Sequence, residues 1–411
     1  MKSVVFVFIA CSIYIPFQAQ ENNPDRVLEA IRTGATYAAE KLLDETGKSR
    51  CDYNMTEGRW HPYEEPWHTG QVINALLAAY EVTQYPGHLS AAQRAGDWWV
   101  TLEIVDHSQL TGMVRAIHGD DAGEVIVFAT VTDGTPGLFR LWKVTGEKKY
   151  AEVPTRAGAW MLENMCDLEE GICYDNVDPV TGKVYKESSP FHADKNDVSL
   201  FDVSRPNTEG SLFLDMYRFN GEKKYLDAFL SLCNSLVEKQ DEHGLWMRFM
   251  PNHPAQNAFH PRFNLWYAES LINAFEETGN QKYLVAAKKT VDRYLAAQRG
   301  DGTIFYKNYL NGEADPGSIC GSAVAFTGLL MMRLGENGVQ DDYTDRINLC
   351  ARWLIRNQFQ ADHPDPNLAG AFLNIRKRNR KGKIWLVNRD VGTSFALRFL
   401  SKYYQHRFGK K

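Results

Sequence analysis

The chain has 411 residues, of which 44% are hydrophobic and 24% are charged, and its formal net charge is −5 at pH 7. This hydrophobic content is typical of a folded protein with a sizeable core and argues against a disordered chain. The acidic balance, with no basic block standing out, argues against nucleic acid as a partner.

The first segment, Met1–Gln20, has the features of a secretory signal peptide. Lys2 precedes an apolar run that is too short and too close to the N-terminus for a membrane span. We expect cleavage near Ala19, so that residues 1–19 are the signal peptide and 20–411 form the mature chain. That chain has 45 basic and 51 acidic residues and no later segment long and apolar enough to cross a membrane. The sequence therefore predicts a secreted protein, located in the periplasm if the source is bacterial.

A helix–turn–helix unit repeats along the mature chain. In His260–Gln298 we expect an apolar helix from Leu265 to Glu277, a Thr-Gly-Asn turn, and an amphipathic helix from Lys282. The same pattern recurs in four further segments: Thr69–Trp99, Gly134–Leu162, Glu209–Val237 and Gly321–Gln358.

Two single helices remain at the ends of the chain, Val27–Asp44 and Val391–His406. We expect them to pair as a sixth hairpin, because repeated helix pairs form either a solenoid or a closed ring. The sequence therefore predicts an all-α fold: one (α/α)6 toroid over residues 20–411, with apolar inner helices and amphipathic outer helices.

The predicted loops are strongly asymmetric. Turns from an inner to an outer helix are short, whereas the six returning loops are long: Cys51–His68, Asp106–Asp133, Cys166–Thr208, Gln240–Phe263, Gly300–Cys320 and Phe359–Asp390. Long loops on a rigid scaffold carry function, and helix N-termini attract anions. We therefore expect an anionic ligand to bind at the mouth where these loops gather.

The long loops and the helix starts beside them are rich in aromatic, histidine and arginine side chains. Aromatic rings stack on the apolar faces of sugars, while polar groups bind the hydroxyls. This composition predicts an acidic oligosaccharide as the partner, although such loops can also simply pack over a large ring. The candidate substrate-binding residues are Trp67, His68, Arg205, Trp246, Arg248, Asn264, Trp266 and Arg389.

Six cysteines remain after the predicted cleavage. Cys166 and Cys173 flank a short acidic loop, and export permits a disulfide there. Cys233 and Cys350 lie on apolar helix faces, where buried free thiols are expected. The spacing offers no zinc pattern. We expect no metal and no cofactor.

Arg262-Phe263-Asn264-Leu265-Trp266 resembles the Arg-x-Asn/Gln-x-Trp motif of the unsaturated glucuronyl and rhamnogalacturonyl hydrolases, which are (α/α)6 enzymes. Asp133-Gly134 is placed like their catalytic Asp. The resemblance implies that Asp133 protonates the substrate while Arg262 and Trp266 hold the sugar. Trp266–Leu271 is also similar to a motif of the sugar 2-epimerases, but Arg205–Glu209 lacks their Pro-Gly-His.

Three function classes stay open from the sequence. Elimination at C4 of a uronic acid, by an oligosaccharide dehydratase or a lyase, needs a cation for the carboxylate, a base and an acid. The mouth contains arginines, histidines and tyrosines that could serve as the cation, the base and the acid. The sequence shows no pair of carboxylates typical of a glycosidase, so we favour elimination. A hydrolase acting through Asp133 is the alternative, and a sugar epimerase or a non-catalytic glycan-binding protein is less favoured. The candidate catalytic residues are Asp133, Glu209, His260, Arg262 and Tyr267.

Overall fold

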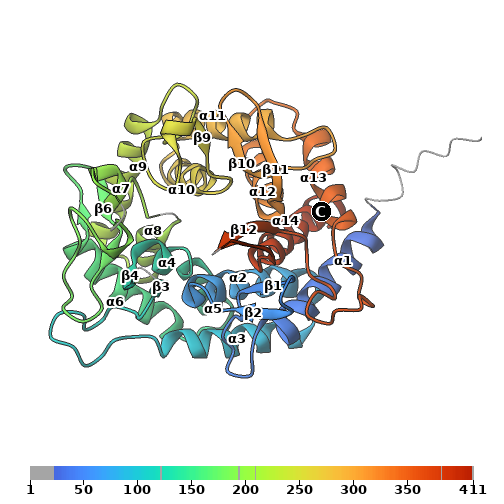
Figure 1. Cartoon of the computed structure of the whole chain (residues 1–411), viewed down its shortest axis with the longest axis horizontal. Helices are drawn as coiled ribbons and strands as arrows, with labels where there is room; N and C mark the ends of the chain where they lie inside the picture. The colour runs from blue at the N-terminus through green and yellow to red at the C-terminus, as the bar shows by residue number, and fades with distance from the viewer. Residues whose placement is uncertain (1–22, 121–122, 193–194, 209, 381, 410–411) are drawn as a thin grey trace, which may run out of the picture.

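The structure, a computed structural model, describes residues 23–409 except 121–122, 193–194, 209 and 381. The predicted signal peptide and the candidate residue Glu209 lie outside the described residues. In the described part of the chain, six inner helices alternate with six outer helices around a ring (Figure 1). Within these residues, no helix combines the length and the apolar content of a membrane span.

The ring consists of six helix hairpins. The inner helices are α2 (Glu65–Thr83), α5 (Thr135–Thr145), α8 (Leu212–Asn220), α10 (Phe263–Thr278), α12 (Gly321–Glu336) and α14 (Val391–Phe408). The outer helices are α1 (Pro24–Tyr37), α3 (Pro86–Val100), α6 (Lys149–Asn164), α9 (Lys223–Lys239), α11 (Gln281–Ala297) and α13 (Thr344–Arg356). Helix α1 packs against α14, which confirms the predicted sixth hairpin.

Side-chain patterns explain the two rings of helices. Helix α2 is buried without interruption from Pro66 to Ala79, as an inner helix covered on all faces must be. Helix α13 buries only one stripe, formed by Cys350, Ala351, Trp353 and Leu354. Inner helices α5, α8 and α10 each end on a glycine with positive φ, which are Gly146, Gly221 and Gly279. Glycine adopts this left-handed cap without a Cβ clash, so the predicted short turns are confirmed.

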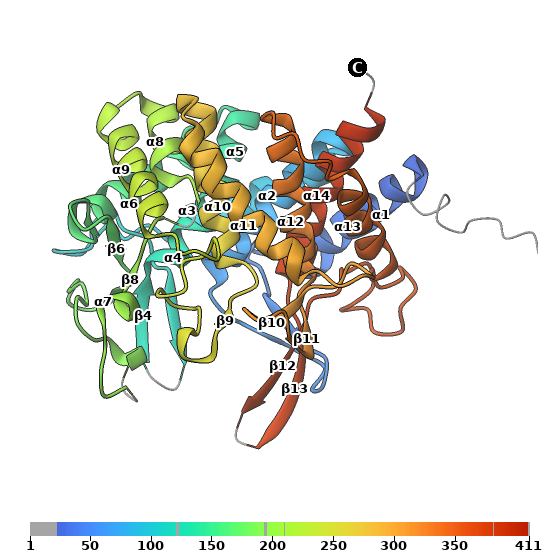
Figure 2. The same cartoon turned by 90° about the horizontal axis from the view of Figure 1, so that it is seen from above.

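The long loops are not irregular throughout, and this corrects the all-α prediction. They carry short strands in four small sheets, on the side of the ring shown at the bottom of Figure 2. The strands are β1 (Asp52–Asn54), β2 (Arg59–His61), β3 (Ile117–Asp120), β4 (Gly123–Val127), β5 (Cys166–Asp167), β6 (Ile172–Tyr174), β7 (Asn176–Val177), β8 (Ser204–Arg205), β9 (Ala258–Phe259), β10 (Phe305–Tyr309), β11 (Ala314–Ile319), β12 (Ile375–Arg380) and β13 (Lys383–Asn388).

These strands fix the loops over the mouth. The largest sheet has the order β12-β13-β1-β2, so it joins the last long loop to the first and links the two ends of the chain. Short helices complete the loops: α4 (Phe128–Thr132), η3 (Pro190–His192), α7 (Leu200–Val203) and η4 (Pro254–Gln256). A further short helix, η2 (Ala38–Leu42), directly continues α1. Helical periodicity could not predict these small sheets, because their strands pair between segments far apart in the sequence.

The cysteine predictions are confirmed. Cys166 and Cys173 form a disulfide across the β5–β6 hairpin. Cys233 and Cys350 are buried free thiols. The disulfide fixes the loop that follows α6, on the mouth side of the ring.

Candidate active site

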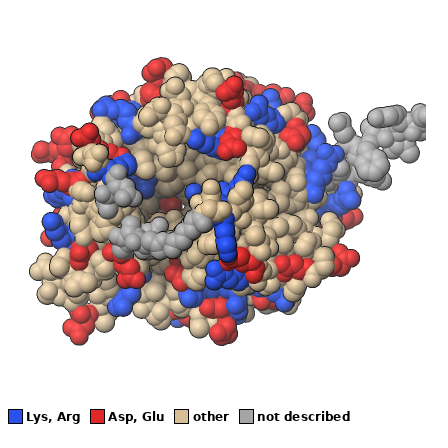
Figure 3. All heavy atoms as spheres, viewed as in Figure 1, with Lys and Arg blue, Asp and Glu red and all other residues tan. Residues whose placement is uncertain are grey.

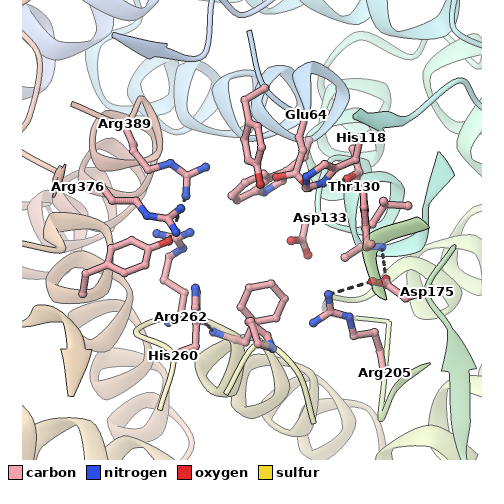
Figure 4. A pocket seen from close by; sticks show the side chains of 18 of the residues that line it. Glu64, His118, Thr130, Asp133, Asp175, Arg205, His260, Arg262, Arg376 and Arg389 are labelled. Carbon is pink, nitrogen blue, oxygen red and sulfur yellow. Dashed lines mark hydrogen bonds and ion pairs between the residues drawn. The ribbon is translucent and has the colours of Figure 1, made fainter. Parts of the chain in front are cut away.

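A cavity of about 360 Å³ opens at the mouth, above the starts of the inner helices. Its walls come from loops that are remote in sequence. Cations gather on one side, and acidic groups on the other side and at the centre (Figure 4). The lining includes Tyr63, Glu64, Trp67, His118, Thr130, Asp133, Asp175, Arg205, His260, Arg262, Tyr306, Arg376 and Arg389.

The basic wall is formed by Arg262, Arg376 and Arg389 (Figure 4). Arg262 is only 1% exposed, and its Nη1 donates to Ser322 Oγ at 3.1 Å. Among the described residues, neither Arg262 nor Arg376 forms an ion pair, and the buried Nε of Arg262 has no hydrogen-bond acceptor. A buried cation without a carboxylate partner is costly, so this wall is suited to an anionic ligand.

Tyr306, on strand β10, is surrounded by these cations. The Arg376 guanidinium lies 4.7 Å from its ring centroid, and Arg389 Nη1 donates to its hydroxyl oxygen at 3.3 Å. Burial alone raises the pKa of this phenol, but Arg376, Arg262 and Arg389 outweigh it and lower the pKa to about 8. A tyrosine with this pKa is a candidate base near neutral pH.

Arg389 is held in place by a buried network. Its Nε donates to both carboxylate oxygens of Asp52, at 3.0 and 3.2 Å. Its Nη2 lies 3.3 Å from His68 Nε2, and His68 Nδ1 contacts Asp390. Arg389 can only donate, so His68 Nε2 is the acceptor in this contact, while its Nδ1 faces the Asp390 carboxylate.

This network also contains a possible set of metal ligands. Potential ligand atoms of Asp52, His68 and Asp390 lie within 4.8 Å of one another. Each already has protein partners, however, since Asp52 pairs with Arg389 and Arg378 and Asp390 accepts from Ser49 Oγ at 2.8 Å. The arrangement is therefore that of an ion-pair network that orients Arg389.

His260 faces the pocket as a neutral hydrogen-bond donor. Its Nδ1 accepts the backbone N–H groups of Arg262 at 3.1 Å and Phe263 at 3.2 Å, at the start of α10. Burial, followed by the charge of Arg262, holds the pKa of His260 well below its ordinary value. The remaining proton is then on Nε2, so this ring donates to a ligand and does not act as a base there.

The opposite wall is acidic and includes a carboxylate–imidazole pair. Glu64 Oε1 lies 2.6 Å from His118 Nδ1 and accepts from Thr130 Oγ1 at 3.1 Å. Burial alone raises the pKa of Glu64, but the His118 ring outweighs it and lowers the pKa to about 2. The carboxylate fixes the orientation of the His118 ring, which is part of the pocket lining.

Asp133 and the Asp175–Arg205 pair complete the pocket. Asp133 lies just before α5, is 3% exposed, and points into the centre of the cavity (Figure 4). Arg205 Nη2 pairs with Asp175 Oδ2 at 3.0 Å, and its Nη1 donates to Met250 O at 2.7 Å. The charge of Arg205 is therefore balanced within the protein, unlike those of Arg262 and Arg376.

Solved structures share this architecture. An unsaturated glucuronyl hydrolase from Bacillus sp. GL1 matches with a TM-score of 0.64 over 93% of this chain and 97% of that chain, at 14% identity. A cellobiose 2-epimerase from Bacillus thermoamylovorans matches with a TM-score of 0.67 over 92% and 100%, at 11% identity. This chain is an (α/α)6 toroid. The fold-level resemblance predicted from the sequence is confirmed.

A heparin-specific unsaturated glucuronyl hydrolase also matches the toroid, with a TM-score of 0.65 over 93% of this chain and 98% of that chain, at 13% identity. No family model matches the sequence, and no curated protein matches it. Identities this low establish the fold alone, and hydrolases and an epimerase share it. The chemistry of the toroid must therefore be argued from its pocket.

Six of the candidate residues named from the sequence line the pocket: Trp67, Asp133, Arg205, His260, Arg262 and Arg389. His68 lies directly behind the wall, fully buried, and contacts Arg389. The loops therefore bring these residues to one mouth, as expected.

Five candidates are not among the residues that line the pocket. Tyr267, Trp266 and Trp246 pack in the core, where Trp246 contacts Tyr267 and Trp266 contacts Phe326. Asn264 is fully buried, and its side chain donates to Asn252 Oδ1 and accepts the backbone N–H of Trp246. Arg248 is exposed and stacks on Phe201. The positions of Tyr267, Trp266 and Trp246 suit support of the scaffold, because their side chains belong to its hydrophobic core.

Glu64, Asp175, Tyr306 and Arg376 line the pocket but are not among the candidates named from the sequence. Tyr306 and His118 belong to the aromatic- and histidine-rich loops, but nothing local distinguishes them from the other residues there. Arg376 lies on β12, and no strand was predicted in that segment. The signal that could have indicated Arg376 is the basic segment from Arg376 to Lys383, in which six of eight residues are Lys or Arg, so the statement that no basic block stands out was wrong for this segment.

The Glu64–His118 pair predicts a pH-dependent stability. The pKa of Glu64 falls from 4.5 to about 2 on folding, so its contribution is fully present above pH 4.5 and is lost as the pH falls toward 2. We expect Glu64→Gln to lower the free energy of unfolding by up to about 3 kcal/mol near neutral pH, and by progressively less below pH 5. Denaturant unfolding across this pH range measures the difference.

The matched control is Glu57→Gln. Glu57 forms a surface pair with Arg59, whose side chain is 66% exposed, so its removal changes stability by less than about 1 kcal/mol. If the loss in the free energy of unfolding of Glu64→Gln stays constant from pH 7 to acidic pH, this would contradict the assignment of the pKa shift to Glu64.

Proposed function

We propose that this protein acts on acidic oligosaccharides that end in a uronic acid, by elimination at C4 to give a 4,5-unsaturated uronyl end. The observation that carries the proposal is the position of Tyr306 between Arg262 and Arg376, two cations for which the described residues offer no ion pair. A uronate carboxylate supplies the missing negative charge, and its C5 proton is then beside the phenol oxygen. Elimination needs this combination of cation and base.

The proposed step proceeds as follows. Arg262 and Arg376 bind the C6 carboxylate, which makes the C5 proton more acidic. The Tyr306 phenolate removes that proton, the C5–H electron pair forms the C4–C5 double bond, and the C4–O bond breaks. The departing oxygen takes a proton from His118, which Glu64 orients. Water leaves in the dehydratase form of the reaction, and a sugar hydroxyl leaves in the lyase form.

Hydrolysis of an already unsaturated uronyl end is the second candidate. The observation that favours it is Asp133, buried at the centre of the pocket just before α5, where the resemblance places a catalytic Asp. The unsaturated glucuronyl hydrolases with this fold support the same reading. In this reaction Asp133 protonates C4 and water adds at C5, which gives a hemiketal. The ring then opens to a C5 ketone, and the hemiacetal left at C1 releases the sugar alcohol.

The predicted export of the chain remains part of the proposal. The Cys166–Cys173 disulfide supports it, because disulfides persist in oxidising compartments such as the periplasm. An acidic oligosaccharide is a substrate that an exported enzyme would meet.

The deciding experiment follows ultraviolet absorbance of the C4–C5 double bond during incubation with saturated and unsaturated uronate oligosaccharides, with mass spectrometry of the products. A rise in absorbance with loss of water indicates a dehydratase, and a rise with chain cleavage indicates a lyase. A fall on the unsaturated substrate, abolished by Asp133→Asn, would establish the hydrolase instead. No change with any of them would contradict both candidates.

A further inference from the structure

The β12–β13 hairpin projects from the ring beside the mouth (Figure 2). Strand β12 begins next to the pocket, because Arg376 is part of the pocket wall. The hairpin is strongly basic, which contrasts with the acidic balance of the whole chain. In Figure 3, Lys and Arg side chains gather beside the central hollow, where β12 lies in Figure 1.

The register of β12 and β13 shows which cations lie on each of the two faces of the hairpin. Arg376 pairs with Val387, Lys377 with Leu386, and Arg378 with Trp385. Paired residues share a face and neighbours along a strand alternate, so Arg378, Trp385 and Lys383 share the face of Arg376. Lys377 lies on the opposite face.

Side-chain contacts make this face continuous with the pocket. The Arg378 guanidinium lies 5.3 Å from the ring centroid of Tyr63, which lines the pocket. Trp385 meets His61 edge-on, with ring centroids 6.2 Å apart. Each step of two residues along a strand covers about 7 Å, so Arg378 and then Lys383 lie at increasing distance from the terminal site.

Among the described residues, the cations of this face have only one carboxylate, Asp52, as an ion-pair partner. Asp52 is shared between Arg378, at 3.4 Å, and Arg389, at 3.0 Å. Among the described residues, the buried Nε of Arg378 and the indole N–H of Trp385 have no acceptor, and Lys383 forms no ion pair. All of these groups donate hydrogen bonds, so they match a ligand that carries anionic oxygens.

We propose that this face of the β12–β13 hairpin is an extended subsite that binds carboxylate or sulfate groups on the inner sugars of the substrate. The inference rests on the proposed function, since it places the terminal uronate at Arg262 and Arg376. The preferred substrate is then an oligosaccharide with negative charge on several units. A uronate attached to one neutral sugar reaches only the terminal site.

The test is charge reversal on the two faces of the hairpin. Lys383→Glu and Lys377→Glu change the net charge equally, and both side chains are exposed, so folding is not at stake. With an acidic tetrasaccharide we expect Lys383→Glu to raise KM about tenfold, because a charge-assisted contact is replaced by repulsion. With a disaccharide that has the same uronate end, KM stays within about twofold of the unmodified protein, and Lys377→Glu changes neither value.

The proposed subsite would be contradicted if the two variants changed KM equally. It would also be contradicted if Lys383→Glu changed KM equally for both substrates. Turnover of the disaccharide by the unmodified protein tests the proposed function separately, because that substrate does not reach Arg378 or Lys383. If neither substrate is converted, the proposed function fails, and titration calorimetry with the tetrasaccharide still decides the subsite. Tighter binding to the unmodified protein than to Lys383→Glu supports it, and equal binding overturns it.

Discussion

Replacing Tyr306 with phenylalanine is expected to lower kcat for elimination about 1,000-fold, because the substitution removes the base and leaves the carboxylate-binding arginines in place. KM changes little for the same reason. Stopped or continuous absorbance assays at saturating substrate measure the loss, and circular dichroism confirms that the fold is kept. Phenylalanine fills nearly the same volume, so the buried site is not disrupted.

The pH dependence of the unmodified protein tests the same assignment. The base must be deprotonated to act, and the pKa of Tyr306 is lowered to about 8, so kcat/KM rises with pH and levels off above about 8. We expect the pH profile of the residual kcat/KM of Tyr306→Phe to lack this rise. If that variant keeps full activity and the same limb, Tyr306 is not the base and Asp133 becomes the first target.

Arg376→Gln is expected to have the second-largest effect. Arg376 is the strongest of the three charges that lower the pKa of Tyr306, and it also faces the proposed carboxylate. Its removal raises the pKa of Tyr306, so the rising limb of kcat/KM moves to higher pH by about one unit or more. At neutral pH we expect kcat/KM to fall about 100-fold, as measured from initial rates over a pH series.

Two controls separate charge from position. Arg376→Lys keeps the positive charge, so its rising limb stays near that of the unmodified protein, although a lysine binds a carboxylate less specifically than a bidentate arginine. Arg248→Gln removes an exposed arginine that stacks on Phe201 and is not among the pocket-lining residues, so it leaves both parameters unchanged. A loss in Arg248→Gln equal to that in Arg376→Gln would indicate a general effect of charge.

The residues of the short motif at the start of α10 occupy different positions in the structure. Arg262 precedes the helix and extends into the pocket, whereas Asn264 and Trp266, within its first turn, are buried. An inner helix is apolar on nearly all faces, so its periodicity does not reveal which face meets the mouth. Trp67, from α2, occupies the pocket wall and packs against Trp266 behind it.

The two tyrosines Tyr267 and Tyr306 illustrate the same limit. Tyr267 is next to Trp266 in the motif, but its ring lies in the core against Trp246. Tyr306 has no neighbouring motif, and its pKa depends on Arg262 from one long loop and on Arg376 and Arg389 from another. Coulomb interactions act through space, so a pKa shift of this kind cannot be predicted from local sequence.

By itself, the sequence determined the scaffold: alternating apolar and amphipathic helices, glycine turns on one side, long loops on the other, and the closing pair of α1 and α14. These features depend on local periodicity and loop length, which can be recognised from consecutive residues. Only the tertiary structure decided which side chains meet at the mouth, because the small sheets between distant loops set their distances. It is these distances that place Arg262, Arg376 and Arg389 around one phenol, and the chemistry follows from that placement.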